Sequence, residues 1–547
     1  MAGVIHCLRY EFCWGVFSNA GELSMNGSFR QSMNWLHTWS GLLLSVLLYF
    51  IFITGTAGYF EKEITHWMQP ERPVISEKID QRQIVKMAEQ HLNITAPDAQ
   101  SWWVVFPIAR SYTAVIWWQE SDEQGGKWKN NAFDVQTGNP VITRETGGGK
   151  TLYAMHYVLH YIPKTLAYWI TSLCALFMFI ALITGVIVHK KIFKEFFTFR
   201  PNKKQRSWLD IHNVFSVLPI PFHLMITYSG LVFLMFTSMP GVIVGSYGTD
   251  KEKHNSFVES VFEKPGHPEH NHEPANSLSM LSFMPEIESH WGKGALREIG
   301  MEGKGTAGAH VQVKHHKYSG ISDGEELIYH GITGELLFDS MKEPSAQFAS
   351  KKLYKVFTDL HEGNFAGTAL RWLYFISGLM GAGMIATGMI LWAIKRREKA
   401  RRIGVEDTGL KLVEYSNVGI VVGLPIAIAV YFWANRIVPI DIENRASWEI
   451  NSLFITWFLM LITPFILANK LTLQALWVKQ LLLASALYLL LPMLNALTSD
   501  KNLVSAVLQD DWVMAGFDLT MILIGLIFGC IARYLIKNMK TKEIACT

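Results

Sequence analysis

Four histidines of this 547-residue chain are the residues whose type and spacing indicate chemistry. Two of them, His37 and His212, open similar apolar runs, WLHTWSGLLLSVLLYFIFITGTAGYF and WLDIHNVFSVLPIPFHLMITYSGLVFL. The glycine that follows, Gly55 or Gly230, lies 18 residues later in both runs, since 55 − 37 and 230 − 212 are equal. Eighteen helical residues rise about 27 Å, close to the thickness of a bilayer core. Each run is therefore expected to hold an imidazole at one membrane face and a small residue at the other.

The other two histidines, His160 and His361, each precede an apolar run that ends in glycine and basic residues. Two imidazoles that face each other across an apolar bundle suit axial ligation of b-type haem, because the porphyrin requires an apolar slot and its iron binds nitrogen. We therefore predict two haems, held by His37 with His212 near one membrane face and by His160 with His361 near the other. Such a pair would carry electrons across the membrane.

Three further histidines are alternative ligands. His156 lies one helical turn before His160, and His189 follows the apolar run that starts after it. His223 is 11 residues beyond His212 (223 − 212), about 16 Å deeper into the same span, and an ionisable residue at that depth is a functional candidate. The matched positions in the other copy are occupied by Phe357, Trp392 and Leu48. Without a matched partner, these three histidines are less favoured than the first four.

The composition indicates a membrane protein that positions these histidines on helices. Half of the residues are hydrophobic, only 17% are charged, and the mean hydropathy is +0.18. Runs long enough to span a bilayer are found at 34–60, 166–189, 211–240, 367–394, 416–436, 449–468, 474–495 and 512–536. The predicted fold class is a mainly α-helical polytopic membrane protein with about eight transmembrane helices.

The basic clusters predict the orientation of these helices. Residues 189–206, 395–402 and 537–542 are rich in Lys and Arg and all fall on one side of an eight-span chain. Because cytoplasmic loops carry an excess of Lys and Arg, that side is expected to be cytoplasmic, with both termini. Residues 61–155 and 241–355 are then expected to lie outside.

Each outside segment is expected to fold as a small α+β domain. Strand-like runs such as WWVVFPIA, TAVIWWQE and AHVQVKHH are followed by a Thr-Gly turn signal in both segments. The same order of features over about 30–200 and 205–402 predicts an internal duplication about an axis along the membrane normal. Four tryptophans of the first segment are either core residues of the strands or contacts for a ligand; they are Trp102, Trp103, Trp117 and Trp118.

The predicted boundaries follow from these runs. They are a cytoplasmic segment at 1–29, a first span at 30–60, an outside domain at 61–155, spans at 156–200 and 205–240, a second outside domain at 241–355, a fourth span at 356–402 and a C-terminal four-helix unit at 416–536. No glycine-rich dinucleotide motif follows a predicted strand, so we expect no flavin or nicotinamide domain. Electrons must then come from a membrane quinol or from a cytoplasmic donor.

The order of several motifs resembles that of the PepSY-associated transmembrane family, which includes the inner-membrane ferrisiderophore reductases of Gram-negative bacteria. The motifs are LHTWSGLLLSVLLYFIFITG, FDVQTG, LITGVIVHKKIFK, LHEG and TGMILW, within about residues 30 to 402. This resemblance implies periplasmic PepSY-like domains, b-type haem on His37, His212, His160 and His361, and reduction of Fe(III) in siderophores. It also implies the bacterial inner membrane as the location. The four C-terminal helices depart from the short form of that family.

Two other classes of function remain alternatives to a haem-containing reductase. One is a non-enzymatic membrane sensor whose PepSY-like domains bind peptides or proteases, and the other is a permease for a metal chelate. The reductase requires ferric siderophore as its substrate, a bilayer around it and no nucleic acid. Haem content separates the three classes, because neither the sensor nor the permease needs the four histidines.

Overall fold

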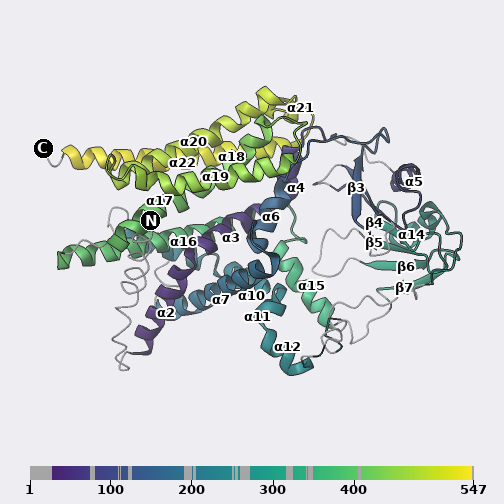
Figure 1. Cartoon of the computed structure of the whole chain (residues 1–547), viewed down its shortest axis with the longest axis horizontal. Coiled ribbons are helices and arrows are strands. Elements are labelled where there is room, and N and C mark those ends of the chain that lie inside the picture. The colour runs from purple at the N-terminus through teal and green to yellow at the C-terminus, as the bar shows by residue number, and fades with distance from the viewer. Residues whose placement is uncertain are drawn as a thin grey trace, which may run out of the picture.

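The computed structural model describes residues 28–73, 80–108, 110, 113–120, 126–189, 200, 205–248, 250, 252, 257–258, 271–315, 325–340, 342, 349–404 and 408–544. Long helices form one body, and an antiparallel sheet with its own short helices stands at one end of them (Figure 1). The N-terminal segment predicted at 1–29 lies almost entirely outside the described residues. The chain is a mostly helical, multi-pass membrane protein.

Six helical segments are long and apolar enough to cross a membrane. They are α7 (Lys164–Val188), α16 (Thr368–Ile403), α17 with α18 (Thr408–Val421 and Gly423–Ile437), α19 (Arg445–Ile466), α20 (Leu473–Thr498) and α22 (Trp512–Ile544). Two bent pairs also pass this test when each pair is taken together, which gives up to eight spans. The sequence prediction of about eight spans agrees with the upper count.

The two bent pairs contain the first and third predicted spans. Helices α2 (Phe29–Leu43) and α3 (Ser45–Gly58) meet at 65°, and α9 (Gln205–Val217) and α10 (Ile220–Phe233) meet at 62°. Pro219 and Pro221 flank the start of α10, and proline removes a backbone donor and disfavours a continuous helix. No proline lies at the break between α2 and α3, and the structure offers no similar reason for that bend.

The helices that carry the histidines pack in matched pairs. Helix α2 packs on α7 as α9 packs on α16, and α3 packs on α16 as α10 packs on α7. Outside the spans, α6 (Gly148–Val158) packs on α3, and α15 (Ala349–Glu362) packs on α10. These matched contacts place a short outer helix beside each bent pair. The internal duplication itself stays a prediction.

The two segments between the spans contribute strands to one sheet, and their division into two α+β domains stays a prediction. Seven strands follow the order β3-β2-β1-β4-β5-β6-β7, with all neighbours antiparallel. Their bounds are Ser101–Val105, Ala114–Gln119 and Trp128–Phe133 for β1 to β3, and Leu296–Glu302, His310–His315, Glu326–His330 and Leu336–Asp339 for β4 to β7. Strands β1 and β4 pair with each other, with Trp103 opposite Gly300, so two edges that would otherwise stay unpaired are joined.

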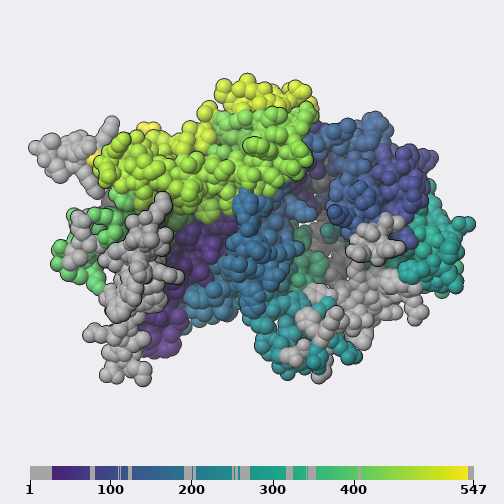
Figure 2. Space-filling view, in the orientation of Figure 1, coloured from purple at the N-terminus to yellow at the C-terminus, as the bar shows by residue number. Residues whose placement is uncertain are grey.

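Short helices cover one face of this sheet. Helix α5 (Gln81–Thr95), the 3₁₀ turn η1 (Met280–Phe283) and α14 (Met284–Trp291) lie on the side away from the long helices (Figure 1). Trp102 and Trp118 are buried in the core beneath them, at 3% and 7% exposure. The opposite face of the sheet looks toward the long helices, and Figure 2 shows a recess between the two parts.

The remaining helices are short or belong to the C-terminal unit. Helix α4 (Glu61–Met68) continues from α3 and contacts α22 and α18, and α21 (Leu503–Leu508) contacts α22. Helices α11 (Met235–Ser238) and α12 (Pro240–Tyr247) follow α10. Helices α17 to α22 cover the predicted C-terminal four-helix unit at 416–536, which stays a prediction as a unit of its own, and they pack against the histidine-bearing helices through the largest apolar core of the described residues.

Candidate functional site

A cavity at the end of the helices nearer the sheet, which we call the outer cavity after the predicted orientation, holds two histidines. Its volume is about 450 Å³, within the range of roughly 300–1,000 Å³ that is typical of small-molecule sites. Residues of α3, α6, α7, α10 and α15 line it, and most of them are apolar or aromatic. The His156 and His361 rings both line this cavity, with ring centroids 6.3 Å apart and planes inclined by 20°.

Each of these two imidazoles lies against a glycine of a bent span. A Cβ atom placed on Gly55 of α3 would come within 3.5 Å of the His156 ring, and one on Gly230 of α10 within 3.4 Å of His361 Cε1. The small-residue pairs seen in the sequence thus receive histidines from other helices. They are not simply the far ends of the spans that begin with His37 and His212.

A second pair of histidines repeats this contact nearer the other end of the helices. A Cβ atom on Gly185 of α7 would come within 3.1 Å of His37 Cε1, and one on Gly388 of α16 within 3.4 Å of His212 Cε1. The imidazoles of His37 and His212 also lie within electrostatic range of each other and of His189. His37 and His212 thus take matched positions against glycines of α7 and α16.

Hydrogen bonds fix the tautomer of three of these four rings through backbone carbonyls. The Nδ1 atom of His37 bonds to the Ala181 carbonyl at 2.9 Å, and that of His212 to the Met384 carbonyl at 3.0 Å. His156 bonds in the same way to the carbonyl of Tyr153. Since a carbonyl oxygen only accepts, Nδ1 must carry the proton, and Nε2 keeps its lone pair.

The fourth ring, His361, reaches the same state through a hydroxyl. Its Nδ1 lies 2.8 Å from Ser229 Oγ, and Ser229 donates its own proton to the Met225 carbonyl at 2.6 Å. The Ser229 oxygen must then accept from Nδ1. Among the described residues, none accepts or donates a hydrogen bond at Nε2 of these four rings, so all four offer that atom to a ligand. Metal-binding histidines typically have this arrangement, with the second ring nitrogen held by an outer partner.

His160, which the sequence favoured over His156, lies elsewhere. Helix α6 ends at Val158, and Leu159 takes a left-handed conformation with φ of 52° that turns the chain. The His160 ring then stacks on Phe454 of α19, with centroids 5.7 Å apart. It is not among the described residues that line the cavity. The structure thus places His156, and not His160, beside His361.

The alternative candidate His223 has the opposite tautomer. Its Nε2 bonds to the Ser377 carbonyl at 3.2 Å, and its Nδ1 has no hydrogen-bond partner among the described residues. The ring is fully buried between Phe52 and Phe222, which line the cavity. His189 lies near His37 and His212 at the end of α7. Within the described part of the chain, no hydrogen bond anchors Nδ1 of either histidine.

The outer site favours neutral imidazoles at neutral pH. Burial, and then the nearby His156, lower the pKa of His361 to about 3. Burial also lowers the pKa of His156. The adjacent Glu362 carboxylate accepts a hydrogen bond from the Tyr153 hydroxyl at 2.8 Å at the edge of the cavity. Neutral imidazole is the form that binds metal, so burial prepares this pair for ligation.

A buried polar network joins the C-terminal helices to the histidine-bearing part, and sequence reasoning missed it. Arg445 pairs with Glu449 on α19, and both side chains are fully buried. Glu449 also accepts from the Thr146 hydroxyl at 2.6 Å and from the Asn435 amide at 2.7 Å. Paired charges in this position cost free energy when one partner is lost. The network therefore anchors the loop before α6 to α18 and α19.

The polar residues of the last spans belong to a neighbouring part of this network. Asp518 accepts from the Trp67 indole at 2.9 Å and from the Asn495 amide at 3.1 Å. Arg436 donates to Asn495 at 3.0 Å and lies 3.9 Å from the centre of the Trp67 ring. Nothing in these bonds leaves a carboxylate free for a ligand. This cluster connects α4 to the C-terminal helices and serves stability.

The comparison with known families gives a match to the part of the chain that carries the histidines. The description PepSY-associated TM region matches residues 34–395, more than half of the chain. The chain belongs to this family. The match covers the four anchored histidines and the sheet, and it ends before α17, so the C-terminal helices lie outside it. No curated protein matches the chain.

Proposed function

We propose that this PepSY-associated membrane protein is a b-type haem reductase that passes electrons across the inner membrane to Fe(III)-siderophore in the periplasm. One observation carries the proposal: four partly buried imidazoles have Nδ1 anchored and, among the described residues, no partner at Nε2, in two matched pairs of the same bundle. A sensor or a permease has no need for this arrangement. The membrane, the orientation with both termini in the cytoplasm and the two outer PepSY-like units belong to the same proposal.

The outer cavity fits a haem by two criteria. A metal–imidazole bond is about 2 Å long, so two imidazoles on opposite sides of one iron hold their ring centres roughly 6 Å apart. The centroids of His156 and His361 are 6.3 Å apart. The lining also supplies the apolar and aromatic surface that a porphyrin requires, including Leu48, Ile51 and Met178. We therefore assign the outer haem to His156 and His361 in place of His160 and His361.

The inner pair fits by its hydrogen bonds. His37 and His212 bond to carbonyls of α7 and α16 and lie beside Gly185 and Gly388, as the outer pair lies beside Gly55 and Gly230. When bound, b-type haem supplies one-electron transfer at each level. The residues of the chain would hold the haem, keep the histidines in the tautomer with Nε2 unprotonated and exclude water from the slot.

The substrate chemistry is simple. A siderophore holds Fe(III) through hard oxygen ligands, and one electron converts this ion to Fe(II), which the same ligands hold less tightly. Iron is then released on the outer side. The electron enters on the cytoplasmic side from a membrane quinol or a cytoplasmic donor, and no side chain is required to form a covalent intermediate.

The visible absorption spectrum of the purified full-length protein tests this proposal. We expect a reduced b-type spectrum with about two haems per chain, which ferric siderophore reoxidises. The control is the variant His91→Ala, because His91 is a histidine of the outer sheet domain whose Nε2 is bonded to a backbone carbonyl, and it should keep the full spectrum. A folded preparation without haem would overturn the proposal.

A further inference from the structure

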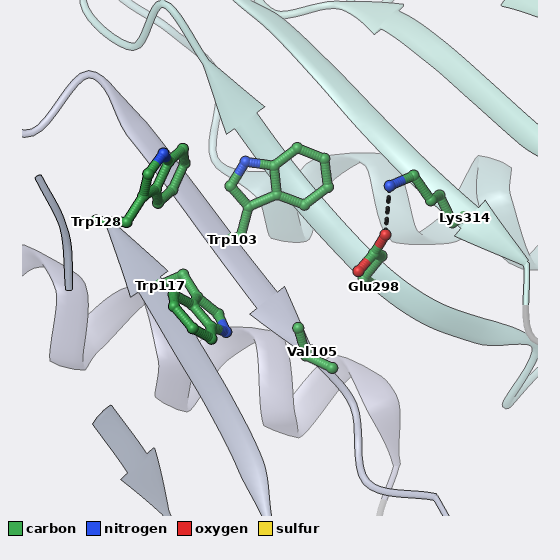
Figure 3. Close-up of a pocket in the computed structure, with 6 residues that line it drawn as sticks. All are labelled: Trp103, Val105, Trp117, Trp128, Glu298 and Lys314. Carbon is green, nitrogen blue, oxygen red and sulfur yellow. Dashed lines mark hydrogen bonds and ion pairs between the residues drawn. The ribbon is translucent and has the colours of Figure 1, made fainter. Parts of the chain in front are cut away.

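Three tryptophans line a shallow pocket on the face of the sheet that α5 and α14 leave uncovered. Trp103 on β1, Trp117 on β2 and Trp128 on β3 form it with Val105, Glu298 and Lys314, and its volume is about 370 Å³. Figure 3 shows the three indoles gathered on one side, with the Glu298–Lys314 ion pair beyond Trp103. We call this surface the tryptophan shelf.

The strand register explains why these indoles meet. Trp103 and Trp117 are direct partners across β1 and β2, so their side chains lie on the same face of the sheet. The Trp103 ring lies over Gly300 of β4, where a Cβ atom would come within 2.3 Å of it. Gly300 therefore provides the space in which the Trp103 ring lies flat on the sheet.

The shelf is not part of the domain core. Trp102 and Trp118, the neighbours in sequence, point to the opposite face and are buried beneath α5 and α14. Trp128 keeps 47% of its surface exposed, although burial of one large aromatic side chain is favourable by roughly 1.5–3 kcal/mol. Exposed aromatic clusters of this kind commonly mark binding surfaces.

A short segment of chain connects the shelf to the outer histidine site. Val105 ends β1, and Arg110 follows five residues later (110 − 105). Arg110 donates to Glu63 at 2.6 Å and to the Tyr59 carbonyl at 2.9 Å, and Tyr59 lines the cavity of His156 and His361. The face of the sheet opposite α5 and α14 is turned toward the long helices (Figure 1).

We propose that the tryptophan shelf binds the aromatic rings of a catecholate-type ferric chelate, an inference that rests on the proposed function. Indole faces stack favourably on flat rings, whereas an aliphatic hydroxamate chelate presents no such ring. The Lys314 ammonium lies 5.1 Å from the centre of the Trp103 ring, and beyond its ion pair with Glu298 it keeps N–H groups that can donate to the negatively charged oxygens of a catecholate complex. The shelf thus selects a class of siderophore before the electron is transferred.

Binding of gallium complexes to the full-length protein in lipid nanodiscs tests this inference without any redox step. Ga(III) resembles Fe(III) in charge but is not reduced, so isothermal titration measures binding alone. We expect a Ga(III) tris-catecholate to bind at least roughly tenfold more tightly than an aliphatic Ga(III) trihydroxamate. Each of Trp117→Leu and Trp128→Leu should weaken the catecholate complex roughly fivefold.

The matched control is Trp448→Leu, because Trp448 is also exposed, at 55%, but lies on α19. It should leave binding unchanged. Equal affinity for the two chelate classes, or a Trp128→Leu variant that binds like the wild type, would overturn the inference. Trp128 is half exposed on an edge strand, so this variant is expected to fold even if Trp117→Leu does not.

The two proposals fail separately in this design. Catecholate binding that depends on Trp117 and Trp128 in a protein without haem would support the shelf and reject the reductase. Haem reoxidation by ferric siderophore with no effect of either tryptophan variant on gallium binding would reject the shelf alone.

Discussion

His361 donates a hydrogen bond from Nδ1 to the hydroxyl oxygen of Ser229 over 2.8 Å, while Ser229 donates to the Met225 carbonyl. This relationship sets which nitrogen of His361 is free, although Ser229 itself lies 132 residues away in the sequence. The other three anchored histidines bond to carbonyl oxygens, which side-chain substitution cannot remove, although His37 and His212 also lie 3.4 Å and 3.2 Å from the hydroxyls of Thr184 and Thr387. Substitution of Ser229 can therefore change the hydrogen bond at Nδ1 of His361 without changing those of the other three histidines.

We expect Ser229→Ala to raise the midpoint potential of the outer haem. Loss of the hydrogen bond makes the His361 imidazole a weaker donor, and a weaker donor stabilises the ferric state less. Spectroelectrochemical titration measures this shift. Ser216→Ala is the matched control, because Ser216 donates to the backbone of His212 and not to its ring, so both potentials should stay in place. Equal potentials in the Ser229→Ala variant and the wild type would contradict the assignment of His361.

Haem content distinguishes the two histidines at the end of α6. His156→Ala should lose one of two haems, since its ring lies 6.3 Å from that of His361, whereas His160→Ala should keep both because its ring stacks on Phe454. A pyridine haemochrome assay on both variants gives the ratio of haem to protein. A full haem complement in His156→Ala, with loss in His160→Ala, would return the ligand to the position that the sequence favoured.

The choice between these two histidines shows what sequence reasoning lacks. The repeated Leu-His pair made His160 the match for His361, but the helix ends at Val158 and the left-handed Leu159 turns His160 away. A helix end cannot be placed within one turn from pattern alone. His37 and His212 lie well inside helices, where a repeated spacing keeps its meaning, and their pairing stays a prediction.

In the fold too, local patterns predicted single helices and strands, whereas contacts between distant segments were missed. Hydrophobic runs predicted the long helices, and alternating runs predicted β1, β2 and β5. Strand β4 was missed, and so was its pairing with β1, which merges the two outside segments into one sheet. Pairing of residues that are about 200 positions apart in sequence leaves no local pattern. The pairing of histidines with glycines of other helices was missed for the same reason.

The variant Gly185→Val tests whether the close contact with Gly185 confines the His37 ring. Gly185→Val places branched methyl groups where a Cβ atom alone would lie 3.1 Å from His37 Cε1, so His37 must move. We expect loss or a spectral shift of the inner haem, with the outer haem retained, as measured by low-temperature absorption spectroscopy. Gly41→Val on α2 is the control, because no atom lies within 4 Å of a Cβ at that site. An unchanged inner haem in Gly185→Val would show that His37 is not confined by α7.

The Arg445–Glu449 pair tests the role of the C-terminal unit. Both side chains are fully buried, so Glu449→Gln leaves an unpaired Arg445 charge and should destabilise the protein by roughly 3–5 kcal/mol. Thermal unfolding in detergent measures the loss. The matched control is Glu120→Gln, whose partner Lys129 is half exposed and whose loss should be nearly neutral. If both variants unfold like the wild type, this network does not hold the C-terminal helices in place.

The hydrogen bond between His66 and Asp511 joins α4 to the start of α22, and we expect its contribution to stability to be lost at acidic pH. His66 donates to the Asp511 carboxylate at 2.8 Å, and Asp511 also accepts from the Met514 amide at 3.1 Å. Burial alone raises the pKa of Asp511, but these hydrogen bonds and the nearby charges of His66 and Lys501 outweigh it and leave the pKa below its ordinary value. The unfolded chain therefore takes up a proton at this site at a higher pH than the folded protein.

Because the unfolded chain is protonated first, the folded state loses stability as the pH falls. Above the ordinary aspartate pKa of about 3.9 both states are ionised and the full stabilisation is present, and it is lost as the pH falls below that value. We expect Asp511→Asn to lower stability by about 1 kcal/mol at pH 7, since the charge-assisted hydrogen bond becomes a neutral one. The difference in thermal midpoint between the wild type and the variant should shrink as the pH approaches 3. A constant difference from pH 7 to 3 would mean that the Asp511 charge does not contribute to the junction.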